Sequence, residues 1–160
     1  MTVPNPILCT SPDDTPLCVR RDARGVVTLT LNDSARFNAL GSEMLAALQQ
    51  ALDNIAQDDS VRVVVLTGVG KAFCAGHNLK DMAAHPELAW YQQLFAQCSR
   101  MMLSIHKLPV PVIARVHGMA TAAGCQLVAQ CDLAVAADSA TFATSGINYG
   151  LFCATPSVPL

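Results

Sequence analysis

Short segments rich in Val and Leu alternate with longer amphipathic segments along this chain. The short ones have the length and the β-branched content of strands, and they lie at 17–22, 26–31, 62–67 and 112–116. Residues 42–57 and 87–107 instead carry apolar side chains at the three- and four-residue spacing of a helix. Strands that alternate with helices form parallel sheets, so the pattern predicts an α/β layered fold.

Local signals set the boundaries of these elements. Ser42 has a side chain that can cap the N-terminus of the first long helix. Pro109 ends the second long helix, and the inward face of that helix is expected to include Leu88 and Tyr91. Further along, the sequence predicts an Ala-rich helix at 122–130, a short helix at the end of the loop 68–82, and short strands at 133–136 and 141–143. Residues 1–16 are rich in Pro and are expected to form a flexible arm before one domain at 17–160.

Composition excludes several classes of function. The 160 residues are 52% hydrophobic and 14% charged, with a formal net charge of −2, which gives no electrostatic basis for binding nucleic acid or an anionic membrane. No apolar run is long enough to cross a bilayer, and no signal peptide is evident, so a cytoplasmic location is expected. The seven Cys include no CxxC pair, which predicts neither a disulfide framework nor a zinc site.

Two segments, 74–81 (CAGHNLKD) and 120–127 (ATAAGCQL), place small residues where the chain enters a helix. The start of a helix offers unpaired backbone N–H groups and the positive end of its dipole. Two such N–H groups that converge would form an oxyanion hole. The alternative is that the small residues only allow close packing of helix on sheet. Dinucleotide-binding, phosphate-loop, HExxH and GxSxG motifs do not occur.

These segments and their surroundings resemble the crotonase superfamily, also called the enoyl-CoA hydratase/isomerase family. The matching segments are 31–40, 61–82, 109–143 and 146–152, and the resemblance as a whole runs from about residue 17 to the end. The more distinctive motifs within these segments resemble one subgroup of the family most closely. The resemblance implies a spiral of ββα units that is incomplete at its C-terminal side. It also implies a coenzyme A thioester as substrate or ligand, and a homotrimer or hexamer for a full-length protein. The sequence itself gives no support for a metal or another cofactor.

The resemblance assigns roles to individual residues. The backbone N–H groups of His77 and Ala123 correspond to the two oxyanion donors, with Ala123 in a position that the family usually gives to Gly. The remaining substrate-binding positions are Arg36, Asn38 and Ala39, in a loop near the CoA nucleotide, and Asn78, Leu79 and Lys80, next to the first donor.

The chain departs from the family at the two acid/base positions. Typical hydratases use two Glu there, whereas this chain has Gln126 and Gly146. Neither residue can accept a proton near neutral pH, so ordinary hydratase activity is expected to be weak or absent. The alternative function is that of a non-catalytic acyl-CoA-binding or regulatory protein. The His77 side chain is either a replacement base or a wall of the pocket, and a nucleophilic role for Cys153 is a further alternative.

Overall fold

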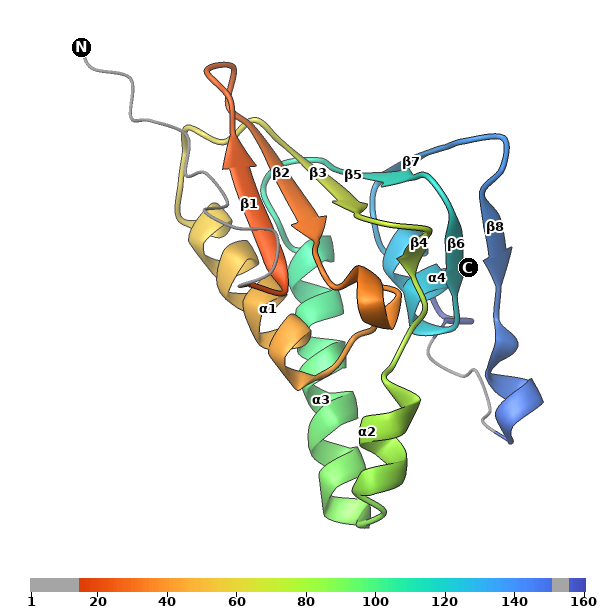
Figure 1. Cartoon of the computed structure of the whole chain (residues 1–160). Coiled ribbons are helices and arrows are strands. Elements are labelled where there is room, and N and C mark those ends of the chain that lie inside the picture. Colours follow the sequence, from red (N-terminus) through yellow and green to blue (C-terminus); the bar gives the residue numbers. More distant parts are fainter. Residues whose placement is uncertain (1–14, 151–155) are drawn as a thin grey trace.

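The computed structural model describes residues 15–150 and 156–160 (Figure 1). Its strands are β1 (Leu17–Arg21), β2 (Val26–Leu31), β3 (Val63–Gly68), β4 (Ala72–Cys74), β5 (Val112–Val116), β6 (Met119–Thr121), β7 (Leu133–Ala136) and β8 (Thr141–Ala143). Its α-helices are α1 (Ser42–Ala56), α2 (Leu79–Ala84), α3 (Leu88–His106) and α4 (Ala123–Ala129), and two 3-10 turns are η1 (Ser34–Arg36) and η2 (Ser145–Tyr149).

Five strands form the larger sheet, in the order β1-β2-β3-β5-β7. The hairpin of β1 and β2 is antiparallel, whereas the other three pairings are parallel. Val27 pairs with Val64, and Val64 pairs with Val112, so one row of Val crosses the middle of the sheet. The α/β architecture with much parallel sheet that the sequence predicts is therefore confirmed.

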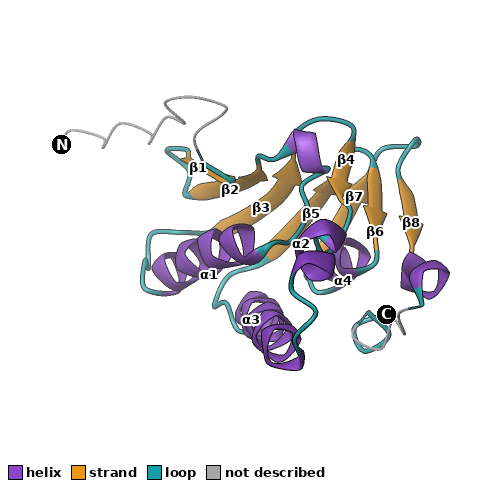
Figure 2. Ribbon diagram, turned by 60° about the horizontal axis from the view of Figure 1, so that its bottom comes forward, coloured by secondary structure: helices purple, strands orange, loops and turns teal. Residues whose placement is uncertain are grey.

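Helices cover one face of this sheet, which accounts for its alternating burial. Figure 2 shows α1 to α4 on the same side of the strands. Side chains on that side, such as Leu29, Val64 and Leu66, are almost completely buried, whereas Thr28 and Val65 on the other side are half-buried. The predicted inner face of α1 is confirmed, since its apolar side chains are all buried: Met44, Leu45, Leu48, Leu52 and Ile55.

A smaller parallel sheet, in the order β4-β6-β8, stands beside the larger one. The sequence predicts β8 but not β4 or β6. Each of these has only three residues, with Ala, Cys or Thr in place of a clear two-residue alternation, so neither gives a periodic signal. Ala72 pairs with Met119, and Ala120 pairs with Phe142.

Three local expectations are corrected. Gly41, not Ser42, occupies the N-cap of α1, and Ser42 is the first helical residue. Leu88 was expected to face the core but is 72% exposed, because it begins α3 where the helix extends beyond the sheet. Cys18 is disulfide-bonded, although the spacing of the Cys residues predicts no such framework.

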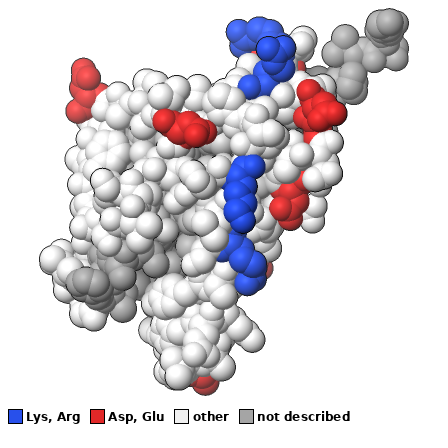
Figure 3. All heavy atoms as spheres, turned by 180° about the vertical axis from the view of Figure 1, so that it is seen from behind, with Lys and Arg blue, Asp and Glu red and all other residues white. Residues whose placement is uncertain are grey.

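The expected arm falls mostly outside the described residues, which exclude 1–14. At the end of the expected arm, Pro16 is held against the domain, because its carbonyl accepts a hydrogen bond from the Asn32 N–H at 2.7 Å. None of the described helices is long and apolar enough to span a bilayer. On the face in Figure 3, Lys, Arg, Asp and Glu side chains are scattered over a largely uncharged surface.

Candidate functional site

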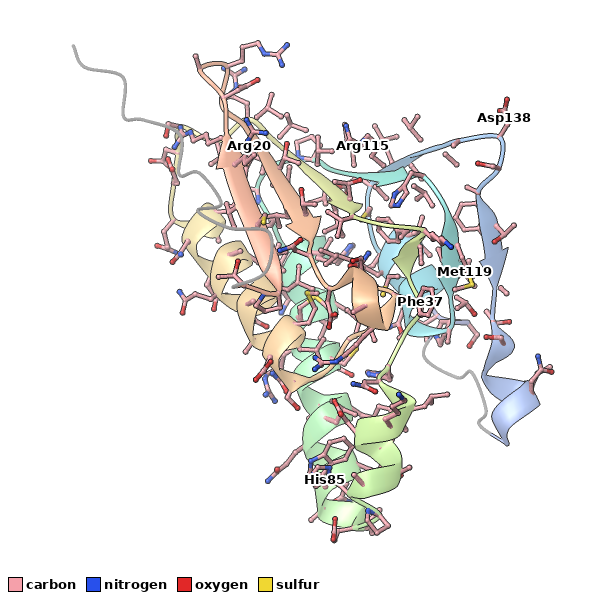
Figure 4. All side chains as sticks on the ribbon, in the orientation of Figure 1. Arg20, Phe37, His85, Arg115, Met119 and Asp138 are labelled. Carbon is pink, nitrogen blue, oxygen red and sulfur yellow. The ribbon has the colours of Figure 1, made fainter. Side chains whose placement is uncertain are left out.

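The carboxyl ends of β4, β6 and β8 lie at one edge of the smaller sheet, because these strands are parallel. Ligands of α/β proteins commonly bind at such an edge. Beyond it the chain continues from β4 into residues 75–77, from β6 into α4 and from β8 into η2. Figure 4 labels Met119 on β6 and Phe37 in the loop after η1, whose carbonyl accepts a hydrogen bond from the Ala75 N–H. The edge therefore brings together three segments that are distant in the sequence.

Two hydrogen bonds hold the ends of β6 and β8 together. The Thr121 and Ser145 hydroxyl oxygens lie 2.5 Å apart, and the Ala122 N–H donates to the Ala143 carbonyl at 2.8 Å. This hydroxyl pair has no signal in the sequence, because its two residues lie 24 positions apart. The pair fixes the start of η2 next to the start of α4.

Gly76 brings the segment after β4 against the start of α4. Its φ of +86° is a conformation that side chains disfavour. A Cβ built on Gly76 would stand 3.0 Å from the Ala122 Cβ, 3.0 Å from the Thr121 oxygen and 3.1 Å from the Ala123 nitrogen. Only Gly fits here without displacing its neighbours, so the small residue at this point serves the close approach of two backbones.

The backbone N–H groups of His77 and Ala123 are unpaired within the described structure. Neither donates a hydrogen bond to any of the described residues, 15–150 and 156–160. His77 directly follows Gly76, and Ala123 is the first residue of α4. An unpaired N–H at the start of a helix is a donor for a negatively charged or polarised oxygen. The two N–H groups that the resemblance assigns as oxyanion donors therefore lie on segments that contact each other at Gly76 and Ala123, and their role stays a prediction.

Strain at the start of α4 is a feature that the sequence does not reveal. Ala122 has φ 51° and ψ −122°, a combination that is costly for a residue with a Cβ. Behind it, Gly124 packs so closely on β4 that an added Cβ would lie 2.1 Å from the Cys74 carbonyl oxygen. Such strain, commonly about 1–3 kcal/mol per residue, concentrates at functional sites and persists only where the surroundings enforce it.

The His77 side chain is held by the neighbouring loop. Its Nδ1 lies 3.1 Å from the Leu40 carbonyl oxygen, and the Phe95 ring meets it edge-on with centroids 5.3 Å apart. A carbonyl only accepts, so Nδ1 carries the proton and Nε2 is the acceptor of the neutral ring. Burial lowers the pKa of His77, and the bond to Leu40 opposes this in part. The neutral imidazole therefore has an unprotonated Nε2 near neutral pH.

The two positions that the resemblance aligns with the family's acid/base residues lie on the elements that follow β6 and β8. Gln126 lies on α4, three residues beyond Ala123, and is only 7% exposed. Its Oε1 is buried and has no hydrogen-bond donor in the described structure. Gly146 is buried within η2, next to Ser145. Both belong to the segments that meet at the carboxyl edge.

Asn38 organises the loop rather than exposing a group to a ligand. Its side chain is completely buried. Its Oδ1 accepts from the Asp33 N–H at 2.9 Å, and its Nδ2 donates to three backbone carbonyls, those of Val69 and Ala72 at 2.9 Å and that of Phe73 at 3.2 Å. Any contribution of Asn38 to binding would act through the loop that it holds, and the binding role stays a prediction.

Arg36, Ala39 and Asn78 line a groove of about 580 Å³ that does not include His77 or Ala123. Three carboxylates also line it, and the Arg36 guanidinium pairs with one of them at 3.3 Å. The carboxylates belong to Asp33, Glu43 and Asp81. This charge disfavours phosphate groups. The groove is therefore a poor fit for the phosphates of a nucleotide, despite containing three of the predicted binding residues.

Asn78 caps α2, since its Oδ1 accepts from the Lys80 N–H at 3.1 Å and from the Asp81 N–H at 3.4 Å. Leu79 and Lys80 begin that helix and are exposed. Their exposure leaves both side chains accessible, but the structure does not bring them into contact with Ala123, and their binding role stays a prediction.

Thiol chemistry has little support at this edge. Cys125 on α4 is buried, and burial raises its pKa, which suppresses the reactive thiolate. Cys153 lies outside the described residues. Within the described ranges no three His, Cys, Asp or Glu side chains cluster in a way that would hold a metal ion.

Comparisons with known proteins give a consistent result. The family described as "Enoyl-CoA hydratase/isomerase" matches residues 21–158. "Enoyl-CoA hydratase domain-containing protein 3, mitochondrial" of Xenopus laevis is 45% identical over 146 residues, which are 91% of this chain and 50% of that protein. Its human namesake is 42% identical over 140 residues, 88% of this chain and 46% of that protein. A crystal structure of an enoyl-CoA hydratase from Mycobacterium smegmatis superposes with a TM-score of 0.90 at 62% identity, covering 91% of this chain and 57% of that one.

These matches confirm the resemblance inferred from the motifs, including its subgroup, and the crotonase-like fold. The chain spans about half the length of the curated relatives it matches. The cytoplasmic location expected from the sequence is contradicted, because the relatives from Xenopus laevis and Homo sapiens are both named as mitochondrial proteins.

Proposed function

The chain belongs to the enoyl-CoA hydratase/isomerase family, and from that premise we propose that it binds an acyl-CoA thioester at the carboxyl edge of β4, β6 and β8. The thioester carbonyl oxygen lies between the N–H groups of His77 and Ala123. The observation that carries this proposal is that both N–H groups are unpaired and that Gly76 lets their backbones approach one another.

Such a pair of donors stabilises negative charge on the carbonyl oxygen. When a proton leaves the carbon next to a thioester, charge builds up on that oxygen as an enolate forms. Fixed N–H donors in a site shielded from water lower the energy of this state, and the loss of one donor in an enzyme typically costs about 3–4 kcal/mol. We therefore assign His77 and Ala123 a role through their backbones, not through their side chains.

The groups that would move protons differ from those of the family's hydratases. Gln126 and Gly146 stand where the resemblance places two Glu, and neither accepts a proton near neutral pH. We accordingly propose that hydration of an enoyl thioester by the usual pair is weak or absent. The neutral His77 ring has a free acceptor at Nε2, but its Nδ1 is occupied by Leu40, and the imidazole is chiefly a support for its own backbone.

A second candidate function follows from the same two residues. A protein that keeps the oxyanion donors and lacks the acid/base pair would bind acyl-CoA without turning it over. The loss of both carboxylates, at Gln126 and Gly146, favours this non-catalytic role. The contributions of Arg36, Ala39 and Lys80 to CoA binding, and a homotrimeric or hexameric assembly, are further proposals that rest on the family alone.

Binding is tested by isothermal titration calorimetry with butyryl-CoA, a saturated thioester that cannot be hydrated. We expect butyryl-CoA to bind more tightly than free CoA, since free CoA lacks the thioester carbonyl oxygen. Gly76→Ala is expected to weaken butyryl-CoA binding at least about tenfold, because its Cβ would crowd the Ala123 nitrogen. Equal affinities for butyryl-CoA and CoA would refute the placement of the carbonyl.

Turnover separates the two candidate functions. The loss of enoyl-thioester absorbance with crotonyl-CoA is measured for the protein and for the double variant Gln126→Glu, Gly146→Glu. Silence from the parent and activity in the variant would show an intact thioester site that lacks its acid/base pair. Turnover by the parent would mean that other groups move the protons, and the non-catalytic role would then be rejected.

A further inference from the structure

The backbone turn that carries the Ala123 N–H is strained and must be held in place by its neighbours. Ala122, the residue before the donor, has φ 51° and ψ −122°, a conformation that costs free energy in a residue with a Cβ. The methyl group of Ala122 also cannot cap the start of α4. The direction of the Ala123 N–H therefore depends on the contacts that keep this turn from relaxing to an ordinary conformation.

Two hydrogen bonds brace the turn from the side of β8 and η2. The Ala122 N–H donates to the Ala143 carbonyl at 2.8 Å, and the Thr121 and Ser145 hydroxyl oxygens lie 2.5 Å apart. The first bond extends the pairing of β6 with β8, in which Thr121 lies opposite Ala143. The second bond joins side chains, and it ties the residue before Ala122 to the first residue of η2.

The opposite side of the turn is bounded by Gly76 and offers contact without hydrogen bonds. A Cβ added to Gly76 would lie 3.0 Å from the Thr121 carbonyl oxygen and 3.1 Å from the Ala123 nitrogen. Among the described residues, no backbone hydrogen bond joins Gly76 or His77 to the turn. Contact on this side limits how closely the two segments approach, and it leaves the direction of the Ala123 N–H to the bonds with β8 and η2.

We infer that the hydroxyl pair of Thr121 and Ser145 positions the Ala123 N–H for the thioester oxygen. The inference rests on the proposed function and adds two positioning residues to its site, which act through the backbone of the turn. Both side chains are short, and Thr has few rotamers, so their bond fixes Thr121 closely to the start of η2. Loss of the bond would let Ala122 relax and turn the N–H away from the oxygen.

A hydroxyl pair of this kind can be removed without leaving a deeply buried polar group. Thr121 and Ser145 are both half-buried, so water can pair with the hydroxyl that remains after one substitution. We therefore expect the variants to fold, and their effect to fall on the ligand that uses the Ala123 N–H.

Isothermal titration calorimetry with butyryl-CoA and free CoA tests the pair on the whole chain. Thr121→Val and Ser145→Ala each remove one hydroxyl, and each is expected to weaken butyryl-CoA binding about tenfold while the affinity for free CoA stays unchanged. Thr121→Ser keeps a hydroxyl and is expected to stay within about twofold of the parent. Thr141→Val is the matched control, because it removes an exposed hydroxyl from β8, and we expect no effect.

The double variant Thr121→Val, Ser145→Ala should lose no more affinity than either single variant, because both substitutions remove the same bond. Losses that add in the double variant, or equal losses for butyryl-CoA and free CoA, would overturn the inference, since they indicate general damage to the fold. An unchanged butyryl-CoA affinity in Ser145→Ala would overturn the inference and leave the thioester site standing. If the parent itself binds butyryl-CoA no better than free CoA, the proposed function fails, and the inference fails with it.

Discussion

The backbone nitrogen of Ala123 lies 3.1 Å from the point where a Cβ on Gly76 would stand. This relationship joins the segment after β4 to the first residue of α4, and it leaves the N–H groups of His77 and Ala123 on neighbouring pieces of backbone. A site built from main-chain groups depends on how closely two segments of backbone approach one another. Gly→Ala substitutions, each of which adds one methyl group, therefore test such a site directly.

Gly76→Ala is predicted to lower both stability and acyl-CoA affinity. The new Cβ would be crowded by Ala122 and Thr121, and the φ of +86° would strain any residue other than Gly. The expected loss in the free energy of unfolding, from urea titration, is about 1–3 kcal/mol. Gly150→Ala is the matched control, since Gly150 has φ +73° and open space around its Cβ position. A similar loss of affinity in the control would show that strain alone, and not crowding of the site, is responsible.

Gly124→Ala, in α4, is predicted to be more damaging than Gly76→Ala. Its Cβ would lie 2.1 Å from the Cys74 carbonyl oxygen, so α4 would have to move away from β4. We expect a loss of about 3 kcal/mol or more in the free energy of unfolding, together with loss of ligand binding. Gly41→Ala is the comparison, because the nearest atom there is a carboxylate oxygen of Asp81 at 3.3 Å. Near-native stability of Gly124→Ala in thermal unfolding would contradict this packing.

Asn38→Ala is predicted to loosen the loop between β2 and α1. The substitution removes hydrogen bonds to Asp33, Val69, Ala72 and Phe73 from a completely buried side chain. The expected destabilisation in urea is about 2–4 kcal/mol. Asn38→Gly loses the same bonds but tolerates the φ of 55°, so it should be less destabilised than Asn38→Ala. An unchanged unfolding midpoint in both variants would show that these bonds do not hold the loop.

Stability is predicted to fall as the pH drops through the range just below the ordinary pKa of His, about 6.5. Burial lowers the pKa of His77 in the folded chain, so the unfolded chain takes up its proton at a higher pH. The unfolded state then binds more protons in that range, and the free energy of unfolding decreases. Urea titrations above and below the range should show a smaller decrease for His77→Gln than for the parent. The exposed His106 supplies the control His106→Gln, and identical pH profiles for parent and His77→Gln would rule out this contribution.

The sequence predicts the parts of this fold that depend on periodic burial. The strands that contain Val27, Val64 and Val112 and the inner face of α1 follow from apolar spacing in the sequence, whereas the register that aligns the three Val comes from the fold. The short strands β4 and β6 do not, because three residues rich in Ala and Cys carry no period and owe their structure to the backbones beside them.

Some features of the candidate site could likewise be predicted from the sequence, and others could not. His77 and Ala123 could be named only through the family resemblance, because small residues at the starts of helices are equally compatible with close packing of helix on sheet. The strain at Ala122 and the pairing of Thr121 with Ser145 could not, since both arise from contacts between segments that are separate in the sequence. The charge of the groove beside Arg36 also depends on three carboxylates that only the fold brings together.

The central claim, that a thioester oxygen lies between two backbone N–H groups, is tested most directly by nuclear magnetic resonance of ¹⁵N-labelled protein titrated with butyryl-CoA. We predict that the amide protons of His77 and Ala123 shift downfield together with a single affinity, and that free CoA does not cause this shift. Saturation of butyryl-CoA binding without a change in these two amide signals would contradict the claim.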